Sequence, residues 1–340
     1  MDRTAIVILN WNGSDMLRRF LPSVMTCSGT ARVYVADNAS TDDSMQMLAE
    51  KFPDVGLIPL EKNYGFAEGY NRALAQVDAE YYVLLNSDVE VTPGWIAPLT
   101  TFMDNRIDVA ACQPKLLSAL NRDSFEYAGA CGGYIDKYGY PFCRGRIFNN
   151  VERDSGQYDS PAEITWATGA CLMVRADDWR RAGGLDSRFF AHNEEIDFCW
   201  RLKIAGRKVY AVPQSVVYHV GGATLSKDDP MKTYLNFRNN LTMLYKCLPE
   251  SELRCVLRVR ALLDFAAAVK MLVLDRNIGA FKAVLRGRRD FKRWRHDFDA
   301  DRIAIHGDMS KEDTSDARCP FSLLYQYYMK GRKTFDALPH

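Results

Sequence analysis

Three carboxylates lie within the four consecutive residues Glu194-Glu195-Ile196-Asp197. Neighbouring carboxylates repel one another, and this repulsion raises the pKa of at least one of them toward neutrality. A carboxylate with such a pKa can accept a proton from a hydroxyl group as a general base. The alternative interpretation is structural, because acidic residues also stabilise the first turn of a helix.

A second set of polar residues occurs in four short loops that are rich in Asn, Asp and Gly. The loops are Asn10-Trp11-Asn12-Gly13, Asp37-Asn38-Ala39-Ser40, Asn63-Tyr64-Gly65-Phe66 and Asn86-Ser87-Asp88. Turn chemistry alone can account for any single one of them. Each loop follows a predicted strand, however, so all four are expected at one edge of a sheet, where ligands bind in open α/β folds.

The elements that would position these loops alternate between strand and helix. Short apolar, β-branched runs predict buried strands at 4–9, 32–36, 55–60 and 81–85. Helices are predicted to begin at Ser14, behind a capping pattern at Ser40, at Ala67 and at Thr92-Pro93. This alternation predicts an open, mostly parallel α/β sheet. Neither GxGxxG nor GxxxxGK[ST] occurs, which argues against a dinucleotide-binding domain and a P-loop.

The composition is ordinary for a globular protein, with 47% hydrophobic and 26% charged residues. A formal net charge of +1 gives no nucleic-acid signature, so no nucleic-acid partner is expected. Nine cysteines without a CxxC pair indicate neither a disulfide framework nor a zinc site. The chain shows no basic leader and no run of the roughly 18 apolar residues that a spanning helix needs, so we expect a cytoplasmic protein.

In these motifs the chain resembles the inverting glycosyltransferases of family 2, and most of all their bacterial rhamnosyltransferase-like branch. The stretches that carry the resemblance are Ile6–Gly13, Val35–Asp42, Asn63–Ala67, Leu84–Asp88, Thr168–Ala170, Asn193–Arg201 and Val217–His219. They occur in order and at family-like spacings over residues 3–245. The resemblance implies the GT-A fold, a mostly parallel open sheet flanked by helices.

The resemblance also implies a divalent metal ion, Mg²⁺ or Mn²⁺. Asn86-Ser87-Asp88 stands where the family has its Asp-x-Asp motif, with Asn86 in place of the first acid, so Asp88 is implied as a metal ligand. His219 matches a histidine that can complete the metal site in related enzymes. Read without the resemblance, Asp88 can belong to a strand-terminal turn and His219 to the core.

The substrate-binding residues follow from the same resemblance. Asp37 matches an acid that hydrogen-bonds the uracil or thymine base, although it can also stabilise the N-terminus of the next helix. The other residues implied in the nucleotide pocket are Asn12, Asn38, Asn63, Gly65, Asn71 and Asn86. Glu195 matches the second acid of the family's acid pair, the general base, and Glu194 is the alternative. The residues implied on the acceptor side are Trp166, Thr168, Gly169 and Asp197, and for Trp166 a packing role is the alternative.

The chain is expected to divide into a GT-A domain, residues 1–248, and a helical extension, residues 249–340. Residues Arg254 to Arg295 include 12 Lys/Arg and 3 Asp/Glu, which gives this segment a local charge of +9. Apolar stripes with basic neighbours are typical of helices that lie on an anionic membrane. Packing on the core or on a second subunit is the alternative. Residues 299–318 are expected to form a loop and 321–328 a final short helix.

The predicted function is transfer of a sugar, with inversion, from a UDP- or dTDP-sugar to a hydroxyl group of a saccharide or lipid-linked saccharide. Assembly of cell-surface polysaccharide or glycolipid, on the inner face of the cell membrane, is the expected setting. One alternative is a sugar nucleotidyltransferase, but the loop after the first strand lacks the basic residues that a triphosphate requires. The other is a non-catalytic sugar-nucleotide-binding protein, against which the joint presence of Asp88, Glu195 and His219 argues.

Overall fold

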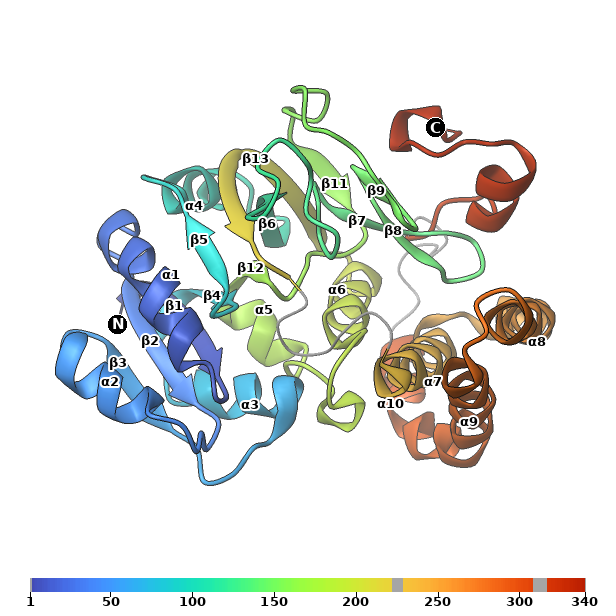
Figure 1. Cartoon of the computed structure of the whole chain (residues 1–340), viewed down its shortest axis with the longest axis horizontal. Coiled ribbons are helices and arrows are strands. Elements are labelled where there is room, and N and C mark those ends of the chain that lie inside the picture. The colour runs from blue at the N-terminus through green and yellow to red at the C-terminus, as the bar shows by residue number, and fades with distance from the viewer. Residues whose placement is uncertain (1, 222–228, 308–316, 340) are drawn as a thin grey trace.

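The computed structural model describes residues 2–221, 229–307 and 317–339. Its centre is a nine-stranded sheet in the order β11-β13-β6-β12-β4-β1-β2-β3, with β5 paired to β13 (Figure 1). The strands are β1 (Asp2–Asn10), β2 (Arg32–Asp37), β3 (Gly56–Pro59), β4 (Ala79–Leu85), β5 (Val89–Val91), β6 (Val109–Ser118), β11 (Ala162–Ile164), β12 (Cys171–Arg175) and β13 (Lys208–His219). Strands β1 to β4 are parallel, whereas β12 runs antiparallel to β4 and β6. The sheet is therefore mixed, and its parallel part is the half that the sequence predicts.

Helices cover both faces of the parallel half. The helices are α1 (Ser14–Cys27), α2 (Ser44–Lys51), α3 (Gly65–Leu74), α4 (Ile96–Asp104), α5 (Ala176–Arg181), α6 (Glu194–Ile204), α7 (Pro230–Cys247), α8 (Glu250–Val273), α9 (Ile278–Trp294) and α10 (Asp299–His306). Successive side chains of a strand point to opposite faces. Accordingly, Ile8 of β1 belongs to one core cluster with Leu21 of α1, and Val7 belongs to the other with Tyr70 of α3.

Two predicted helix starts are wrong by one turn. The helix predicted at Thr92-Pro93 begins at Ile96, because the Thr92 hydroxyl donates to the carbonyl oxygen of Val216 (2.7 Å) and holds the turn against β13. The helix predicted behind Ser40 begins at Ser44. There the carboxylate of Asp42, rather than the Ser40 hydroxyl, accepts from the Ser44 amide (3.1 Å).

A small antiparallel sheet, in the order β10-β9-β8-β7, lies beside the main one (Figure 1). Its strands are β7 (Gly133–Ile135), β8 (Pro141–Cys143), β9 (Arg146–Ile147) and β10 (Asn150–Val151). The C-terminal segment 317–339 packs on it, and Leu323 and Leu338 share a cluster with Phe142 and Ile147. In this segment the short helix predicted at 321–328 spans 323–329, and its last part, Tyr325–Met329, is a π-helix.

The helices that follow β13 pack on the rest of the chain through a continuous core. Leu253 and Val256 of α8 and Phe291 of α9 belong to the same cluster as Trp200 of α6. The predicted loop 299–318 is wrong in its first half, because residues 299–306 form α10, whereas 308–316 lie outside the described residues. No helix in the part of the chain that the structure describes is long and apolar enough to span a membrane.

A buried ionic cluster fixes α8. Arg260 and Asp264 are 2% and 0% exposed, and Arg260 Nε lies 3.0 Å from Asp264 Oδ1. Asp264 also pairs with Arg288 of α9 and accepts from the Tyr140 hydroxyl (3.2 Å). Arg260 in turn donates to the carbonyl oxygen of Tyr138 (3.0 Å). The cluster therefore links α8 to α9 and to the hairpin between β7 and β8.

We expect Asp264→Ala to lower the free energy of unfolding by about 3–5 kcal/mol, because it leaves the buried Arg260 without its charge partner. Urea denaturation followed by circular dichroism measures the change. The matched control is Asp275→Ala, which removes the exposed partner of Lys270 and should cost less than about 1 kcal/mol. Equal, small losses in the two variants would contradict the inferred role of the cluster.

Candidate active site

The loops after β1 and β2 are joined through Asp37. Asn10 Nδ2 donates to Asp37 Oδ1 (3.1 Å) and to the Ser40 hydroxyl oxygen (3.1 Å), and the Ser40 amide donates to Asp37 Oδ2 (3.0 Å). Asn12 Oδ1 accepts from the Thr41 amide (2.7 Å). Each Asp37 oxygen retains a further lone pair. The predicted base-binding acid is thus a rigid acceptor at the carboxyl edge of the sheet.

The next two loops are joined through Asn38. Its Nδ2 donates to Asn63 Oδ1 (3.1 Å) and to the carbonyl oxygen of Gly65 (3.1 Å), and its Oδ1 accepts from the Tyr64 amide (2.9 Å). These bonds give Asn38 and Asn63 a clear role in holding the loop that opens α3. Gly65 has φ +76°, and a side chain there would meet the ring and carbonyl of Phe190. The close approach predicted for a ligand at Gly65 is therefore made by the chain itself.

Asn71 is occupied by the backbone of the segment before α6. Its Nδ2 donates to the carbonyl oxygen of Leu185 (2.7 Å), and its Oδ1 accepts from the Leu185 amide (3.0 Å). Both polar ends of the side chain are therefore paired, and the contacts correct its predicted place in the nucleotide pocket to a structural one.

Asp88, His219 and Glu126 form a buried acid–histidine–acid cluster. His219 Nε2 lies 3.1 Å from Asp88 Oδ1 and 3.5 Å from Asn86 Nδ2, and its Nδ1 lies 3.4 Å from Glu126 Oε1. The Gly221 amide donates to Asp88 Oδ2 (3.2 Å). Burial lowers the pKa of His219, but the bonds to Asp88 and Glu126 and their charges raise it to about 10. The antiparallel pairing of β13 with β5 brings the two ends of this cluster together from positions far apart in the sequence.

The donors of this cluster fit a divalent metal ion. Carboxylate oxygen and imidazole nitrogen are ligands for such ions, and Nε2 would have to lose its proton to bind one. A carboxylate behind the other ring nitrogen, as Glu126 stands here, commonly orients a metal-binding histidine. In residues 2–221, 229–307 and 317–339, no group of three or more His, Cys, Asp or Glu side chains is arranged to hold a metal. The fit is thus to a site with two protein donors, Asp88 and His219.

Glu194 and Glu195 open α6 in a dry environment. One carboxylate oxygen of each, Oε2, is buried without a hydrogen-bond partner among the described residues. Burial, together with the charges of Glu195 and Asp197, raises the pKa of Glu194 well above its usual range. Burial also raises the pKa of Glu195, to about 7. Glu194 is 4% exposed and Glu195 is more open to solvent, so Glu195 is the better placed of the two to exchange a proton at neutral pH.

The segment that leads into α6 has a strained backbone. Phe190, His192 and Asn193 have φ of +66°, +70° and +69°, in the region that residues other than glycine seldom adopt. Asn239 of α7 holds this segment, because its Nδ2 donates to the carbonyl oxygens of Phe189 (3.0 Å), Ala191 (2.9 Å) and His192 (2.8 Å). A strained backbone that is held in place by several hydrogen bonds, as here, is typical of functional sites.

Asp197 points away from the other two acids. It is 0% exposed, and its carboxylate lies 2.8 Å from Arg201 Nε and 2.8 Å from Lys246 Nζ. The carboxylate is therefore not open to an acceptor, and the contacts correct its predicted role to that of an ion-pair partner. The repulsion interpretation applies to Glu194, whose pKa the charges of Glu195 and Asp197 help to raise.

Of the other residues predicted on the acceptor side, Gly169 lies nearest to the acids. A Cβ at Gly169 would lie 2.9 Å from Phe66 Cζ and 3.9 Å from Glu195 Cβ. The following residue, Ala170, accepts from the Asn86 amide (3.0 Å), so this turn lies between the Asn86-Ser87-Asp88 loop and Glu195.

Trp166 and Thr168 are buried. Trp166 is 3% exposed with its ring against Gly133, so the structure favours the packing alternative for it. Thr168 is 2% exposed, and its amide donates to Gln113 Oε1 (3.0 Å), a contact that holds the turn.

Two residues of the site were missed in the sequence. Glu126 has no motif around it, and it reaches His219 only because its amide donates to the carbonyl oxygen of Leu116 in β6 (3.0 Å). Trp11 is 51% exposed in the loop between Asn10, which bonds Asp37, and Asn12. The signal for Trp11 was available, since a large apolar residue in a polar loop calls for an explanation.

Comparison with known proteins gives this geometry a context. Residues 5–125 match the family described as Glycosyl transferase family 2. The chain is 29% identical over 250 residues to the N-acetylglucosaminyl-diphospho-decaprenol L-rhamnosyltransferase of Mycobacterium tuberculosis, which covers 67% of this chain and 79% of that protein.

Solved glycosyltransferase structures share the fold. GalNAc-T7 with UDP, GalNAc and Mn²⁺ superposes with a TM-score of 0.60 at 14% identity, over 90% of this chain and 58% of that one. TarS of S. aureus, residues 1–349 in complex with UDP-GlcNAc, gives 0.57 at 14% identity and covers 89% of both chains. The predicted GT-A fold is thereby confirmed.

We expect Glu195→Gln to stabilise the protein above pH 7. Between the ordinary glutamate pKa of 4.5 and about 7, the unfolded state loses a proton that the folded state keeps, so stability falls as the pH rises through this window. The amide removes that loss of stability, which is on the order of 3–4 kcal/mol at about 1.4 kcal/mol per pKa unit. Thermal unfolding at pH 4 and pH 8 measures the difference between variant and parent. A variant advantage that is the same at both pH values would contradict the raised pKa.

Proposed function

The chain is a family 2 glycosyltransferase of the rhamnosyltransferase-like type, and we propose that it transfers a sugar from a UDP- or dTDP-sugar to a hydroxyl group with inversion at the anomeric carbon. The observation that carries this proposal is the pair of carboxylates at the start of α6, each with one buried oxygen that has no hydrogen-bond partner among the described residues, next to the turn that contacts the Asn86-Ser87-Asp88 loop. A base and a leaving-group site on two sides of one turn are what a single displacement requires.

The donor nucleotide binds at the carboxyl edge of β1 and β2. Support for this comes from the rigid acceptor Asp37 and the exposed ring of Trp11, which suit the polar edge and the flat face of a pyrimidine base. GalNAc-T7 and TarS, which share the fold, are described with UDP and UDP-GlcNAc. Asn12 supports the pocket by ordering the loop through the Thr41 amide.

Asp88 and His219 hold a divalent ion, Mg²⁺ or Mn²⁺, with Glu126 orienting the imidazole. When bound, such an ion neutralises the negative charge that develops on the departing diphosphate. With Asp88 and His219 as its protein donors, such an ion would need further oxygen ligands, which is usual for ions that bind nucleotide phosphates. The side-chain amide of Asn86 faces His219 at the position of the first acid of the Asp-x-Asp motif. An amide there in place of a carboxylate makes the site less negative.

Glu195 accepts the acceptor's proton. The acceptor oxygen forms its bond to the anomeric carbon while the bond from that carbon to the diphosphate oxygen breaks, and the electron pair of that bond leaves with the diphosphate. The proton of the hydroxyl group passes to the Glu195 carboxylate, whose pKa of about 7 matches this task. Because the attack and the departure occur on opposite sides of the carbon, the anomeric configuration inverts.

The acceptor is a saccharide carried on a lipid, and the setting is cell-surface glycan assembly. The mycobacterial relative is named for a diphospho-decaprenol acceptor. In this chain the basic segment 254–295 supplies an attachment to an anionic membrane surface, on its inner face, while residues 1–248 carry the catalytic site. The extension, residues 249–340, is thus a functional unit that packs on the catalytic part.

Incubation with UDP-, dTDP- and GDP-sugars and Mn²⁺ should release a nucleoside diphosphate from at least one donor, and Asp88→Ala should cut this turnover by at least ~10²-fold, as expected for loss of a charge-stabilising group. Asp123→Ala, which removes an exposed acid that pairs with Arg153, is the control and should leave turnover unchanged. Full activity in excess EDTA would reject the metal site. Release of pyrophosphate from a sugar phosphate and a nucleoside triphosphate would instead identify a nucleotidyltransferase.

Glu195→Gln should lower turnover ~10²–10⁴-fold, because the amide keeps the shape but cannot accept the proton. The affinity for the donor should change little, since Asp37 and the metal site are intact. In the parent enzyme, turnover should rise with pH through about 7 as the carboxylate forms. Glu194→Gln is the matched variant and should lose less. Retention of the anomeric configuration in the product would overturn the mechanism, whereas a more severe loss in Glu194→Gln would move the base to that residue.

A further inference from the structure

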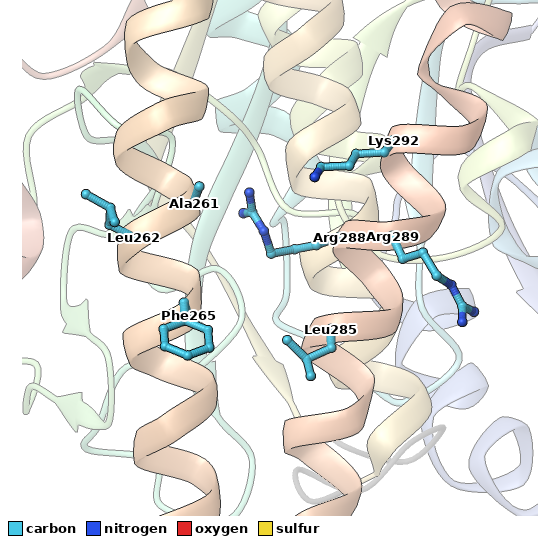
Figure 2. Close-up of a pocket in the computed structure, with 7 residues that line it drawn as sticks. All are labelled: Ala261, Leu262, Phe265, Leu285, Arg288, Arg289 and Lys292. Carbon is cyan, nitrogen blue, oxygen red and sulfur yellow. The ribbon is translucent and has the colours of Figure 1, made fainter.

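A groove runs between α8 and α9, on a part of the molecule that the proposed chemistry does not use. It has a volume of about 480 Å³ and is lined by Ala261, Leu262, Phe265, Leu285, Arg288, Arg289 and Lys292 (Figure 2). Its lining is therefore apolar along α8 and basic along α9. In Figure 2, Leu285 points from α9 toward α8, and Phe265 lies opposite it.

The apolar side of the groove continues along α8 as a solvent-exposed stripe. Leu262, Phe265, Val269 and Val273 recur every three or four residues, so they lie on one face of the helix, and they are 75%, 58%, 37% and 62% exposed. Ile278 of α9, just past the turn, is 57% exposed. A contiguous apolar face of this kind on a globular protein marks a surface that binds another protein, a ligand or a membrane.

Three basic residues line the groove, and two of them are bonded to other groups of the chain. Arg288 pairs with Asp264 and donates to the carbonyl oxygen of Arg260 (3.2 Å). Lys292 points across the groove toward α8 (Figure 2), and it has no hydrogen bond or ion pair with another described residue. Arg289 lines the groove but points away from α8, with its Nε bonded to Asp290 Oδ1 (3.1 Å). Lys292 is therefore the ammonium group that can meet an anionic ligand.

We propose that this groove binds a single anionic membrane lipid, with Lys292 at the headgroup phosphate and Phe265 and Leu285 against the first part of the acyl chains. The stripe from Leu262 to Val273 then lies in the interfacial region of the bilayer. The inference rests on the membrane association in the proposed function. It assigns that association to a defined lipid-binding site and not only to the overall positive charge of the segment. It also sets which face of the extension meets the membrane.

The charge of this face favours an anionic lipid over a second copy of the chain as the occupant of the groove. The segment 254–295 carries a local charge of +9, so a symmetric contact through this face would bring two such segments together. Like charges at an interface disfavour the complex, whereas an anionic lipid surface attracts each basic residue. The volume of the groove is within the ~300–1,000 Å³ range of small-molecule sites.

The test is co-sedimentation of the full chain with vesicles of phosphatidylcholine alone and with vesicles that also contain phosphatidylglycerol. The parent should bind the second kind selectively. Lys292→Gln should weaken this binding about fivefold, the contribution of one basic residue near an anionic surface. Lys51→Gln, which removes the same charge from an exposed position in α2, is the matched control and should change binding less than about twofold. Phe265→Ser should weaken binding at least as much as Lys292→Gln, while Ile107→Ser, an exposed apolar residue outside the groove, should not.

Three outcomes would overturn the site. Equal losses of vesicle binding in Lys292→Gln and Lys51→Gln would mean that only net charge matters. Equal binding of the parent and of Phe265→Ser would exclude the groove as the lipid site. A parent that is a dimer without vesicles, and that Phe265→Ser converts to a monomer, would show a subunit interface instead. Donor hydrolysis without vesicles is measured in parallel and should be unchanged in Lys292→Gln and Phe265→Ser. Its absence in the parent would count against the transferase activity and not against the lipid site.

Discussion

The position of α6 depends on a buried ionic network around Asp197. The carboxylate lies 2.8 Å from both Arg201 and Lys246, and Lys246 lies 2.7 Å from Asp186, which precedes the strained segment. Removing one member of such a network typically costs about 3–5 kcal/mol, because the remaining charges are left buried without partners. Since Lys246 belongs to α7, the network ties the start of α6 to the first of the helices that follow β13.

This arrangement separates structural acids from reactive ones. Among the described residues, Lys246 pairs with Asp186 and Asp197, and Arg201 pairs with Asp197, whereas burial raises the pKa of Glu194 and Glu195. A similar division separates Asn38 and Asn71, whose side chains are occupied by hydrogen bonds within the chain, from Asp88, which faces His219. Uncompensated burial in the candidate active site therefore falls on Glu194 and Glu195, whereas Asp88 and His219 stabilise each other's charged forms.

Much of this fold could be predicted from the sequence, because β1, β2 and β4 are largely buried apolar runs and the loops after β1 to β4 carry a dense polar signal. The antiparallel β12 could not, since a run such as Cys171–Arg175 looks the same in either direction. For the site, pattern and resemblance pointed to the right loops but not to what each side chain contacts. Asp197 and Trp166 are partnered by residues distant in sequence, and Glu126 joins His219 only through the pairing of strands. These are tertiary contacts, which the local spacing of residues in the sequence does not predict.

The last described segment of the chain has a consequence for how the protein is made. Leu323 donates its amide to Asp136 across 187 residues of sequence, and Leu323 and Leu338 complete the small cluster over β8 and β9. During synthesis, which runs at about 5–20 residues per second, Phe142 and Ile147 of the small sheet therefore stay uncovered for roughly 10–40 s. The main sheet has all of its strands by His219 and need not wait. A ribosome that stalls or stops late would release a chain whose principal domain is complete but whose second sheet is bare.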